Sequence, residues 1–431
     1  MSTGVTLSSA PPRGMRDLLP AETALREWAT SVLVATYQRF GFARIETPAL
    51  ENIANLRGGE GGENLKLIFE VLKRGEKLDK ELAERTITRD DLSDLGLRFD
   101  LTVPLVRFYA ANQANLPNPF KTIQVGSVWR AESPQQGRYR QFTQCDIDTF
   151  GIKSEVAEME LIQATSEALL ALEFHDFTVR LNDRRILISL AEHCGVEPDA
   201  FENLFIQIDK LDKIGLAGVE KELVNQGYAE RVVKAVISFL EKASSAKSGN
   251  LESLLPPNAQ EDVVARLRNV LQAIASVSEG RYKIVFDPTL VRGMGYYTGQ
   301  IFEIAAKGYA SSIAGGGRYD KMVGKMTGRD VPGVGFSIGF ERIISILDEK
   351  GVKPPAIGEQ IAFLFDAERD PLEDVLSAAK KLRKKHIVSL QPKKKEMRKQ
   401  LDALLNGGYR AYAVYKSDKS EPEIKPLGSS D

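Results

Sequence analysis

Arginines that stand beside glycines and aromatic residues are the first feature of this sequence that could do chemistry. Arg292 lies in VRGMGYYTG, Arg318 in AGGGRYD and Arg342 in GFERI, and Arg130 precedes a long polar loop, SPQQGRYRQ. A guanidinium keeps its charge at any working pH, pairs with two phosphate oxygens at once and stacks on flat rings. One such arginine is more often solvated or half of an ion pair. The set together favours a binding site for a polyanion such as a nucleoside triphosphate.

A second chemical feature is a polar row along one predicted strand. In FTQCDIDTFG, Phe142, Gln144, Asp146 and Asp148 alternate with Thr, Cys and Ile, so they share one face of the strand. Such a row is unusual for a core face and is typical of a pocket wall. Asp100 similarly stands among apolar residues in RFDLTVPL. Because buried carboxylates are normally paired, these residues are either partners of an internal arginine or acceptors for a cationic ligand.

Several familiar motifs are missing, which narrows the chemistry. The sequence has no GxxxxGK[ST] phosphate loop, and GMGYYTG and GVGFSIG space their glycines one residue too far apart for a dinucleotide fingerprint. With 2 Cys, 3 His and neither HExxH nor CxxC, we expect no protein-bound metal. A nucleotide would therefore have to be bound by the arginines.

The composition limits the kind of protein that can hold these residues. A chain of 431 residues with 43% hydrophobic and 27% charged residues is typical of a globular protein, and its length favours two or three domains. The formal net charge of −1 excludes a general polyanion-coating protein, so any nucleic-acid contact must be local. The N-terminus lacks the apolar region of a signal peptide and no run approaches 18 apolar residues, so we expect a cytoplasmic protein without membrane contact.

The predicted elements divide the chain into five segments. Residues 1–183 alternate helices and strands, starting with a helix after Pro20; LRFDLTVPLVRFYA within them is predicted to contain a strand. Helical periodicity dominates 184–280, which we interpret as an insertion, and strands return over 281–349. Residues 350–360 form a Pro/Gly linker, and 361–431 show the βαβαβ pattern of a small α/β domain.

The last segment carries a basic run. Between Lys380 and Lys399 there are ten Lys or Arg residues and one acidic residue, and Tyr409, Tyr412 and Tyr415 follow. A charge run is usually a solvated helix face, but basic residues close to aromatic ones also suit nucleic acid.

Together these segments resemble the histidyl-tRNA synthetases, a family of class II aminoacyl-tRNA synthetases. PPRGMRDLLP resembles the family's N-terminal signature, FGFARIETPALE its motif 1, VWRAESPQQGRYRQFTQCDID its motif 2 and VGFSIGFERI its motif 3. LVRGMGYYTG and AGGGRYD resemble two segments that set histidyl enzymes apart within the class. The resemblance implies an α+β fold: a class II synthetase-type antiparallel sheet flanked by helices, with a helical insertion and a C-terminal α/β domain of the anticodon-binding type.

The resemblance also implies a reaction. The protein would use ATP, with Mg²⁺ bound to it, to convert L-histidine to histidyl-adenylate and pyrophosphate, then pass histidine to tRNA(His) and release AMP. It would act as a homodimer through the motif 1 region, whose proline is Pro48.

Roles for individual residues follow from the same resemblance. ATP would be bound by residues of motifs 2 and 3: Arg130, Glu132, Arg138, Tyr139 and Arg342. Histidine would be bound by Asp100, Thr102, Gln144, Asp148, Arg292, Tyr296, Tyr297 and Tyr319. Within this set Asp100 and Gln144 would hold the α-ammonium, and Asp148 and Tyr297 the imidazole. Arg292 and Arg130 would be the catalytic residues, with Arg292 on the substrate carboxylate and the α-phosphate.

The sequence departs from the usual family pattern in three places. Position 295 is Gly where many members carry Asp, so no catalytic role belongs there. Asp148 is one methylene shorter than the Glu of many bacterial members, so contact with imidazole would pass through a water. The last domain is shorter than the usual anticodon-binding module, which weakens the expected reading of the anticodon.

Two other functions compete with this one. The regulatory subunit of ATP phosphoribosyltransferase shares the catalytic fold but typically lacks the C-terminal domain and loses catalytic arginines. A nucleic-acid-binding or sensor module would keep the basic run without needing the arginine set. The presence of Arg130, Arg138, Arg292 and Arg342 together with the last domain favours the ligase.

Overall fold

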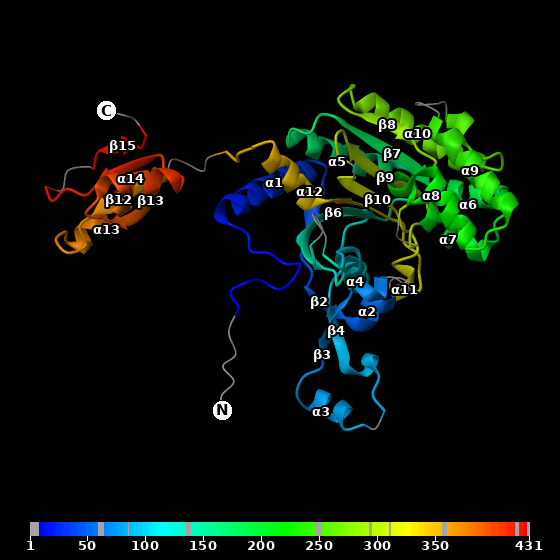
Figure 1. The fold of residues 1–431 in the computed structure, drawn as a ribbon, viewed down its shortest axis with the longest axis horizontal. Coiled ribbons are helices and arrows are strands. Elements are labelled where there is room, and N and C mark those ends of the chain that lie inside the picture. Colours follow the sequence, from blue (N-terminus) through cyan, green and yellow to red (C-terminus); the bar gives the residue numbers. More distant parts are fainter. Residues whose placement is uncertain are drawn as a thin grey trace. The chain divides into compact units, whose positions relative to one another are not determined.

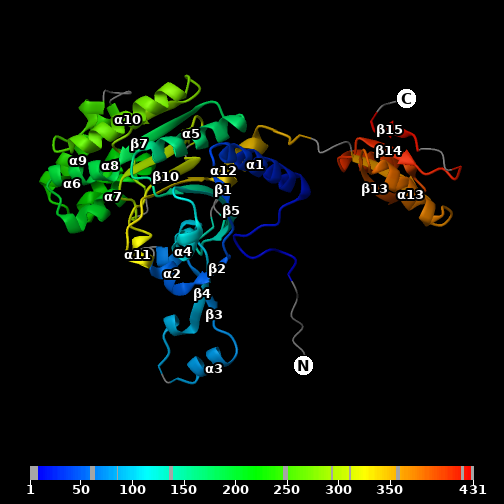
Figure 2. The same ribbon diagram turned by 180° about the vertical axis from the view of Figure 1, so that it is seen from behind.

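The computed structural model describes residues 8–58, 64–84, 86–134, 139–245, 251–292, 295–309, 312–355, 360–418 and 422–428. The chain divides into two compact units, Met1–Lys353 and Pro354–Asp431. The division falls inside the segment expected to be a linker. Figures 1 and 2 show the elements of each unit from opposite sides.

The larger unit is built on an eight-stranded sheet with the order β1-β5-β6-β11-β10-β9-β7-β8. All neighbouring pairs from β5 to β7 are antiparallel, and the two outermost pairs are parallel. This mainly antiparallel sheet flanked by helices confirms the predicted α+β class. Its strands are β1 (Ala43–Arg44), β5 (Phe120–Trp129), β6 (Gln141–Phe150), β7 (Phe177–Asp183), β8 (Lys283–Phe286), β9 (Gln300–Ala306), β10 (Ala314–Arg318) and β11 (Gly333–Ile338).

Helices cover one face of this sheet (Figures 1 and 2). They are α1 (Pro20–Arg39), α5 (Val156–Ala171), α10 (Glu261–Val277) and α12 (Phe340–Glu349). Helix α1 starts at a proline, whose missing N–H has no partner in a first turn anyway, and it ends before Gly41, where φ is +82°. Its buried Leu33 shares a core with Cys145 and Ile147 of β6. Since successive residues of a strand point to opposite faces, the residues of β6 that alternate with Cys145 and Ile147 lie on the other face of the sheet.

A smaller sheet, ordered β2-β4-β3, extends from this unit. Its elements and those around it are β2 (Leu50–Asn52), β3 (Phe69–Leu72), β4 (Ser93–Leu97), α2 (Ile53–Gly58), α3 (Glu76–Leu82), α4 (Thr102–Asn112), α11 (Gly324–Thr327), η1 (Asn64–Leu67), η2 (Arg89–Leu92) and η3 (Gln113–Asn115). The predicted strand in LRFDLTVPLVRFYA is wrong beyond Leu97, where β4 ends. Pro104 lies in the first turn of α4, where proline does not interrupt a helix.

The segment 184–280 is helical, as its periodicity predicts. Its elements, besides α10, are α6 (Arg184–His193), α7 (Phe201–Ile208), α8 (Leu211–Asn225), α9 (Glu230–Ser245), η4 (Pro198–Ala200) and η5 (Leu251–Leu254). Leu187, Leu204, Leu223 and Val236 belong to a second core. No helix in the described part of the chain is long and apolar enough to cross a membrane.

The smaller unit is an α/β domain with the strand order β13-β12-β14-β15. β12 is parallel to both β13 and β14, and β15, which the sequence did not predict, adds an antiparallel edge. Leu372 and Leu376 of α13 are exposed, so the buried face of that helix is narrower than its periodicity suggests. The elements are β12 (Gln360–Phe365), α13 (Leu372–Leu382), β13 (Ile387–Pro392), α14 (Met397–Asn406), β14 (Ala411–Val414) and β15 (Ile424–Pro426).

The basic run of this unit does not form one continuous patch. Residues 380–385 lie before β13 and residues 393–399 after it, so a strand of about 20 Å separates the two groups. The tyrosines also differ from the expectation. Tyr415 is buried against Phe363, and Tyr409 and Tyr412 pack against the apolar cluster around Leu404. Tyr415 is a core residue and the other two are partly buried, so the three do not form a row of exposed rings.

Candidate active site

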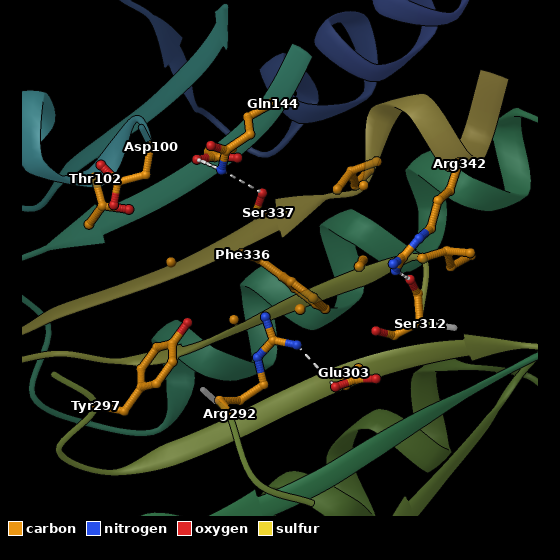
Figure 3. A pocket seen from close by; sticks show the side chains of 18 of the residues that line it. Asp100, Thr102, Gln144, Arg292, Tyr297, Glu303, Ser312, Phe336, Ser337 and Arg342 are labelled. Carbon is orange, nitrogen blue, oxygen red and sulfur yellow. Dashed lines mark hydrogen bonds and ion pairs between the residues drawn. The ribbon is translucent and has the colours of Figure 1, made fainter. Parts of the chain in front are cut away.

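A cavity of about 870 Å³ lies over β6, β10 and β11 (Figure 3). The turn before α4, the segment that leads into β9 and the start of α12 complete its wall. Every predicted site residue that the structure describes lines this cavity: Asp100, Thr102, Arg130, Glu132, Tyr139, Gln144, Asp148, Arg292, Tyr296, Tyr297, Tyr319 and Arg342. Arg138 lies outside the described residues. Residues spread over more than half of the chain thus meet at one place.

Strand β6 forms one side of the cavity through the polar row seen in the sequence. Phe142, Gln144, Asp146 and Asp148 all line the cavity. In the neighbouring β11, Ser337 lies opposite Asp146, and position 335 lies opposite Asp148. The alternation in FTQCDIDTFG is therefore that of a strand with a core face and a pocket face.

The three aspartates at this end of the cavity are buried. Asp100, Asp146 and Asp148 are 2%, 4% and 3% exposed. Burial raises the pKa of Asp100 to about 6 and that of Asp146 to about 7, and it raises the pKa of Asp148 well above its ordinary value. None of the three forms an ion pair with an arginine among the described residues. Of the two alternatives left by the sequence, acceptors for a cationic ligand fit better than internal pairs.

Unpartnered oxygens mark where such a ligand would bind. Asp100 Oδ1 accepts a hydrogen bond from the Val103 backbone N–H at 3.1 Å, but its Oδ2 has no partner among the described residues. Gln144 Oε1 and Asp146 Oδ1 are also buried without a partner. Leaving buried acceptors unpaired costs free energy, so three of them together indicate a place for a donor-rich cation such as an ammonium group.

Tyrosines close the same end of the cavity. Tyr319, which is 2% exposed, donates its hydroxyl hydrogen to Asp148 Oδ1. The rings of Tyr296 and Tyr297 lie 4.7 Å apart, and Tyr296 also meets the Tyr319 ring edge-on at 6.0 Å. Asp148 is therefore fixed by a hydroxyl donor in a compartment with aromatic walls, which suits a flat ring.

Arg292 lies between the two ends of the cavity (Figure 3). Its Nη1 donates to Glu303 Oε2 at 3.0 Å, and its buried Nε has no partner in the part of the chain that the structure describes. Burial opposes its charge, but Tyr297 and the Glu303 carboxylate more than offset this effect, so the pKa of Arg292 is raised. The guanidinium thus stays charged with one N–H available to an anionic ligand.

The predicted nucleotide residues that the structure describes line the same cavity. Arg130 donates from Nε to the Phe99 carbonyl at 3.1 Å, and its guanidinium lies 5.0 Å from the centre of the Phe142 ring. Arg342 donates to the Ser312 carbonyl (Figure 3). The Tyr139 ring lies under the guanidinium of Arg16 at 4.6 Å. These two hydrogen bonds hold Arg130 and Arg342 by backbone carbonyls.

Arg318 does not belong to this set, and the interpretation of its segment as part of a polyanion site is wrong for this residue. Its guanidinium donates from Nε and Nη2 to the two oxygens of Glu158, each at 2.6 Å. Nη1 pairs with Asp320 at 3.2 Å. This buried pair ties β10 to α5, so Arg318 has a structural role.

The glycines of β10 and β11 provide space that sequence reasoning missed. A Cβ at Gly335 would lie 2.0 Å from Asp148 Oδ1, and one at Gly315 would lie 2.6 Å from Arg292 Cζ. Glycine-rich segments such as GVGFSIG and AGGGRYD are typical of turns, but both glycines lie inside strands. They are glycines because the side chains of the site lie against the strand backbone.

Sequence reasoning also assigned no role to Asp146, Ser337 or Glu303. Asp146 belongs to the polar row, so the alternation contained its signal. Glu303 is a lone charge in the apolar strand QIFEIAA, which is a weaker signal. The sequence around Ser337 contains no such signal, because the role of Ser337 depends on its position opposite Asp146 in the neighbouring strand.

The cavity therefore has an acidic end that accepts a cation, a central arginine, and an outer end with further arginines. Such an arrangement can hold an amino acid by its ammonium group with the carboxylate directed at a bound polyphosphate.

Comparisons with known proteins agree with this arrangement. The model of a family described as histidyl-tRNA synthetase matches residues 14–343. A histidine–tRNA ligase of Leifsonia xyli subsp. xyli is 43% identical over 435 residues, which cover 97% of this chain and 98% of that protein. The crystal structure of histidyl-tRNA synthetase from Nostoc sp. PCC 7120 has a TM-score of 0.76 at 26% identity, covering 99% of this chain and 96% of that one. An ATP phosphoribosyltransferase regulatory subunit/histidyl-tRNA synthetase from Bacillus halodurans shares the fold, with a TM-score of 0.73 at 22% identity over 96% of this chain and 100% of that one.

Proposed function

The chain belongs to the histidyl-tRNA synthetase family, and on this premise we propose that it joins L-histidine to tRNA(His) at the expense of ATP. In the first step the histidine carboxylate attacks the α-phosphate of ATP. The bond from the α-phosphorus to the bridging oxygen breaks, which gives histidyl-adenylate and pyrophosphate. In the second step a hydroxyl of the terminal tRNA ribose attacks the acyl carbon, and AMP leaves.

One observation carries this proposal: unpartnered buried acceptors and a partly unpaired arginine line the same cavity. Within the described residues, Asp100 Oδ2 and Gln144 Oε1 lack partners, and so does the Nε of Arg292. The first two suit an α-ammonium and the third suits a carboxylate. An α-amino acid carries both groups on adjacent positions, so it satisfies both ends at once.

Arg292 would supply the main catalytic charge. When a carboxylate approaches an α-phosphate, two anions meet, so fixed positive charge must stabilise the in-line transition state. The pair with Glu303 holds the guanidinium in place before substrate binds, which lowers the cost of reorganisation at the moment of reaction.

The imidazole of histidine would bind between Asp148 and Tyr297. Imidazole has two nitrogens, and a site with partners for both discriminates by roughly 10⁴–10⁵ against analogues that lack the groups. Tyr319 would keep the Asp148 carboxylate oriented toward the ring. Thr102 and Tyr296 would complete the pocket.

ATP would be bound by Arg130, Glu132, Tyr139 and Arg342, together with Arg138. Arg130 would also assist the transfer as the second catalytic residue. Mg²⁺ would enter as part of the nucleotide, because it prefers oxygen ligands and the phosphates supply them. Among the described residues no cluster of three or more His, Cys, Asp or Glu side chains is arranged to hold a metal ion alone.

The test is amino-acid-dependent exchange of pyrophosphate into ATP, measured with each of the twenty amino acids. We expect exchange with histidine alone. The regulatory subunit of ATP phosphoribosyltransferase is the second candidate, because the fold alone does not distinguish it from the ligase. Absence of exchange with every amino acid would favour that candidate.

The smaller unit would contact tRNA. Its ten basic residues between Lys380 and Lys399 are mostly exposed, in two groups. Removal of residues 354–431 should weaken tRNA charging and reduce its salt dependence, because fewer phosphate contacts release fewer counterions. Histidine-dependent exchange should remain. Equal loss of both activities would contradict separate roles for the two units.

A homodimer through the motif 1 region is part of the same proposal, as is a cytoplasmic location. Strand β1 lies at one end of the eight-stranded sheet, and Leu50 is exposed in the same region. Sedimentation equilibrium of the wild type and of Leu50→Glu tests the assembly. We expect a dimer that the charged variant weakens, whereas a monomeric wild type would contradict the proposal.

A further inference from the structure

Asp146 forms a closed hydrogen-bonded group with Gln144 and Ser337 beside the acidic end of the cavity. Gln144 Nε2 donates to Ser337 Oγ at 3.3 Å (Figure 3). It also donates to Asp146 Oδ2 at 3.2 Å. The Ser337 hydroxyl in turn hydrogen bonds to Asp146. Both N–H groups of the Gln144 amide therefore donate hydrogen bonds within this group, and its carbonyl oxygen Oε1 takes no part in them.

This grouping determines which way the amide of Gln144 faces. An ionised carboxylate can only accept hydrogen bonds, so it selects the NH₂ side of its neighbour. A flipped amide would place Oε1 against Asp146 Oδ2 and would leave two N–H groups without acceptors. Gln144 Oε1 is consequently directed away from Asp146 and is one of the buried atoms without a partner.

We propose that Asp146 is a positioning residue for recognition of the substrate amine: with Ser337 it orients Gln144 so that Oε1 accepts from the α-ammonium of histidine. The proposal rests on the proposed function, because it adds a residue to the same site. Asp100 Oδ2 supplies the second acceptor, and Asp146, whose Oδ1 also lacks a partner among the described residues, acts on the ammonium by its charge without accepting from it. Two fixed acceptors define the direction of the ammonium group, and a third interaction with Arg292 at the carboxylate fixes the amino acid.

The structure suggests a reciprocal exchange as the test. In Asp146→Asn the neighbour of Gln144 can donate as well as accept, so the amide is no longer held in one orientation. In the double variant Gln144→Glu/Asp146→Asn, the amide N–H of residue 146 can donate to the carboxylate at 144. The other oxygen of that carboxylate then faces the substrate, and the total charge of the pair is unchanged.

The measurement is calorimetric binding of histidine and of imidazole-4-propionate, which lacks the amino group, to the full chain. We expect Asp146→Asn to weaken histidine binding about tenfold and to leave binding of the propionate unchanged. We expect the double variant to return histidine binding to within about threefold of the wild type. Pyrophosphate exchange should show the same pattern in the KM for histidine, with the KM for ATP unchanged.

Three results would overturn the proposal. Unchanged histidine binding in Asp146→Asn would show that the orientation does not depend on this carboxylate. Equal weakening of both ligands would show a general structural role, and a double variant no better than Asp146→Asn would show direct contact of Asp146 with the amine. Failure of the proposed function gives different results in the wild type. Histidine binding without pyrophosphate exchange would overturn the proposed function alone. Binding of neither ligand would overturn the proposed function and the role of Asp146 together.

Discussion

The two ends of the cavity bind their ligand groups by different physical means. At the acidic end, Asp146 and Asp148 are short side chains on a strand, are nearly inaccessible and are oriented by hydrogen bonds from Gln144 and Tyr319. At the outer end, Arg130 and Arg342 are long side chains, only partly buried, that donate to backbone carbonyls. One end is rigid before the ligand arrives and the other is adjustable.

The difference follows from what each end must distinguish. An amino-acid site must reject other amino acids, and buried polar groups do so because an unsuitable ligand leaves them unpaired. A polyphosphate needs charge and forked donors in approximately the right place, which a guanidinium on a flexible stem provides. On the proposed function, selectivity would therefore reside in the strand and affinity for phosphate in the long side chains.

Arg292 belongs to both ends, so its removal is expected to have the largest effect. Arg292→Ala should lower histidine-dependent exchange by about 10²–10³-fold, because loss of one fixed transition-state donor costs about 2.7–4 kcal/mol. Thermal unfolding should show that the fold is retained. Arg281→Ala, which removes an exposed ion pair with Glu167 outside the cavity, is the matched control and should leave exchange unchanged. A near-normal exchange rate in Arg292→Ala would show that Arg292 does not link the two ends, and would refute its assignment as a catalytic residue.

The sequence predicted the acidic end better than it predicted the glycines around it. Alternation along β6 is a local property with a period of two, so the polar face of Gln144 and Asp148 could be inferred without any tertiary information. Gly335 could not be interpreted in this way. Position 335 must be glycine because the Asp148 carboxylate lies against it. Asp148 is 187 positions earlier in the chain, and only the pairing of β6 with β11 brings the two residues together.

The arginines show the same limit. Arg292 and Arg318 stand in similar glycine and aromatic surroundings, but only Arg292 lines the cavity. Arg318 is on β10 and points to α5, where Glu158 neutralises it. Which face of a strand an arginine occupies depends on register, and its partner lies on a helix distant in sequence. The helix over 102–112 was missed because its apolar run, with an internal proline, fits a buried strand equally well.

Gly335→Ala tests whether the acidic end is as rigid as the structure shows. The new methyl group would lie 2.0 Å from Asp148 Oδ1 and 3.2 Å from Tyr319 Cε1, so the carboxylate must move. We expect the KM for histidine to rise about 10- to 100-fold while the KM for ATP stays within about twofold. Gly58→Ala, where the added methyl group meets nothing, is the control. An equal rise in both KM values would contradict the division of the cavity into two independent ends.

Asp146→Asn tests the energetic cost of the acidic end without substrate and has the smallest expected effect. Because burial raises the pKa of Asp146 to about 7 from an ordinary value near 4, the folded protein retains between these pH values a proton that the unfolded chain releases. Stability from this group is therefore fully present below pH of about 4 and is lost as the pH rises to about 7. The neutral Asn avoids that loss, so urea unfolding should show the variant more stable than the wild type at pH 8, with the difference vanishing near pH 4. The ammonium of bound histidine should reduce the advantage of the variant at pH 8, because it compensates the same charge in the wild type. A variant less stable than the wild type at pH 8 would mean that the carboxylate is already compensated within the protein, and the acidic end would then not be held ready for a cation.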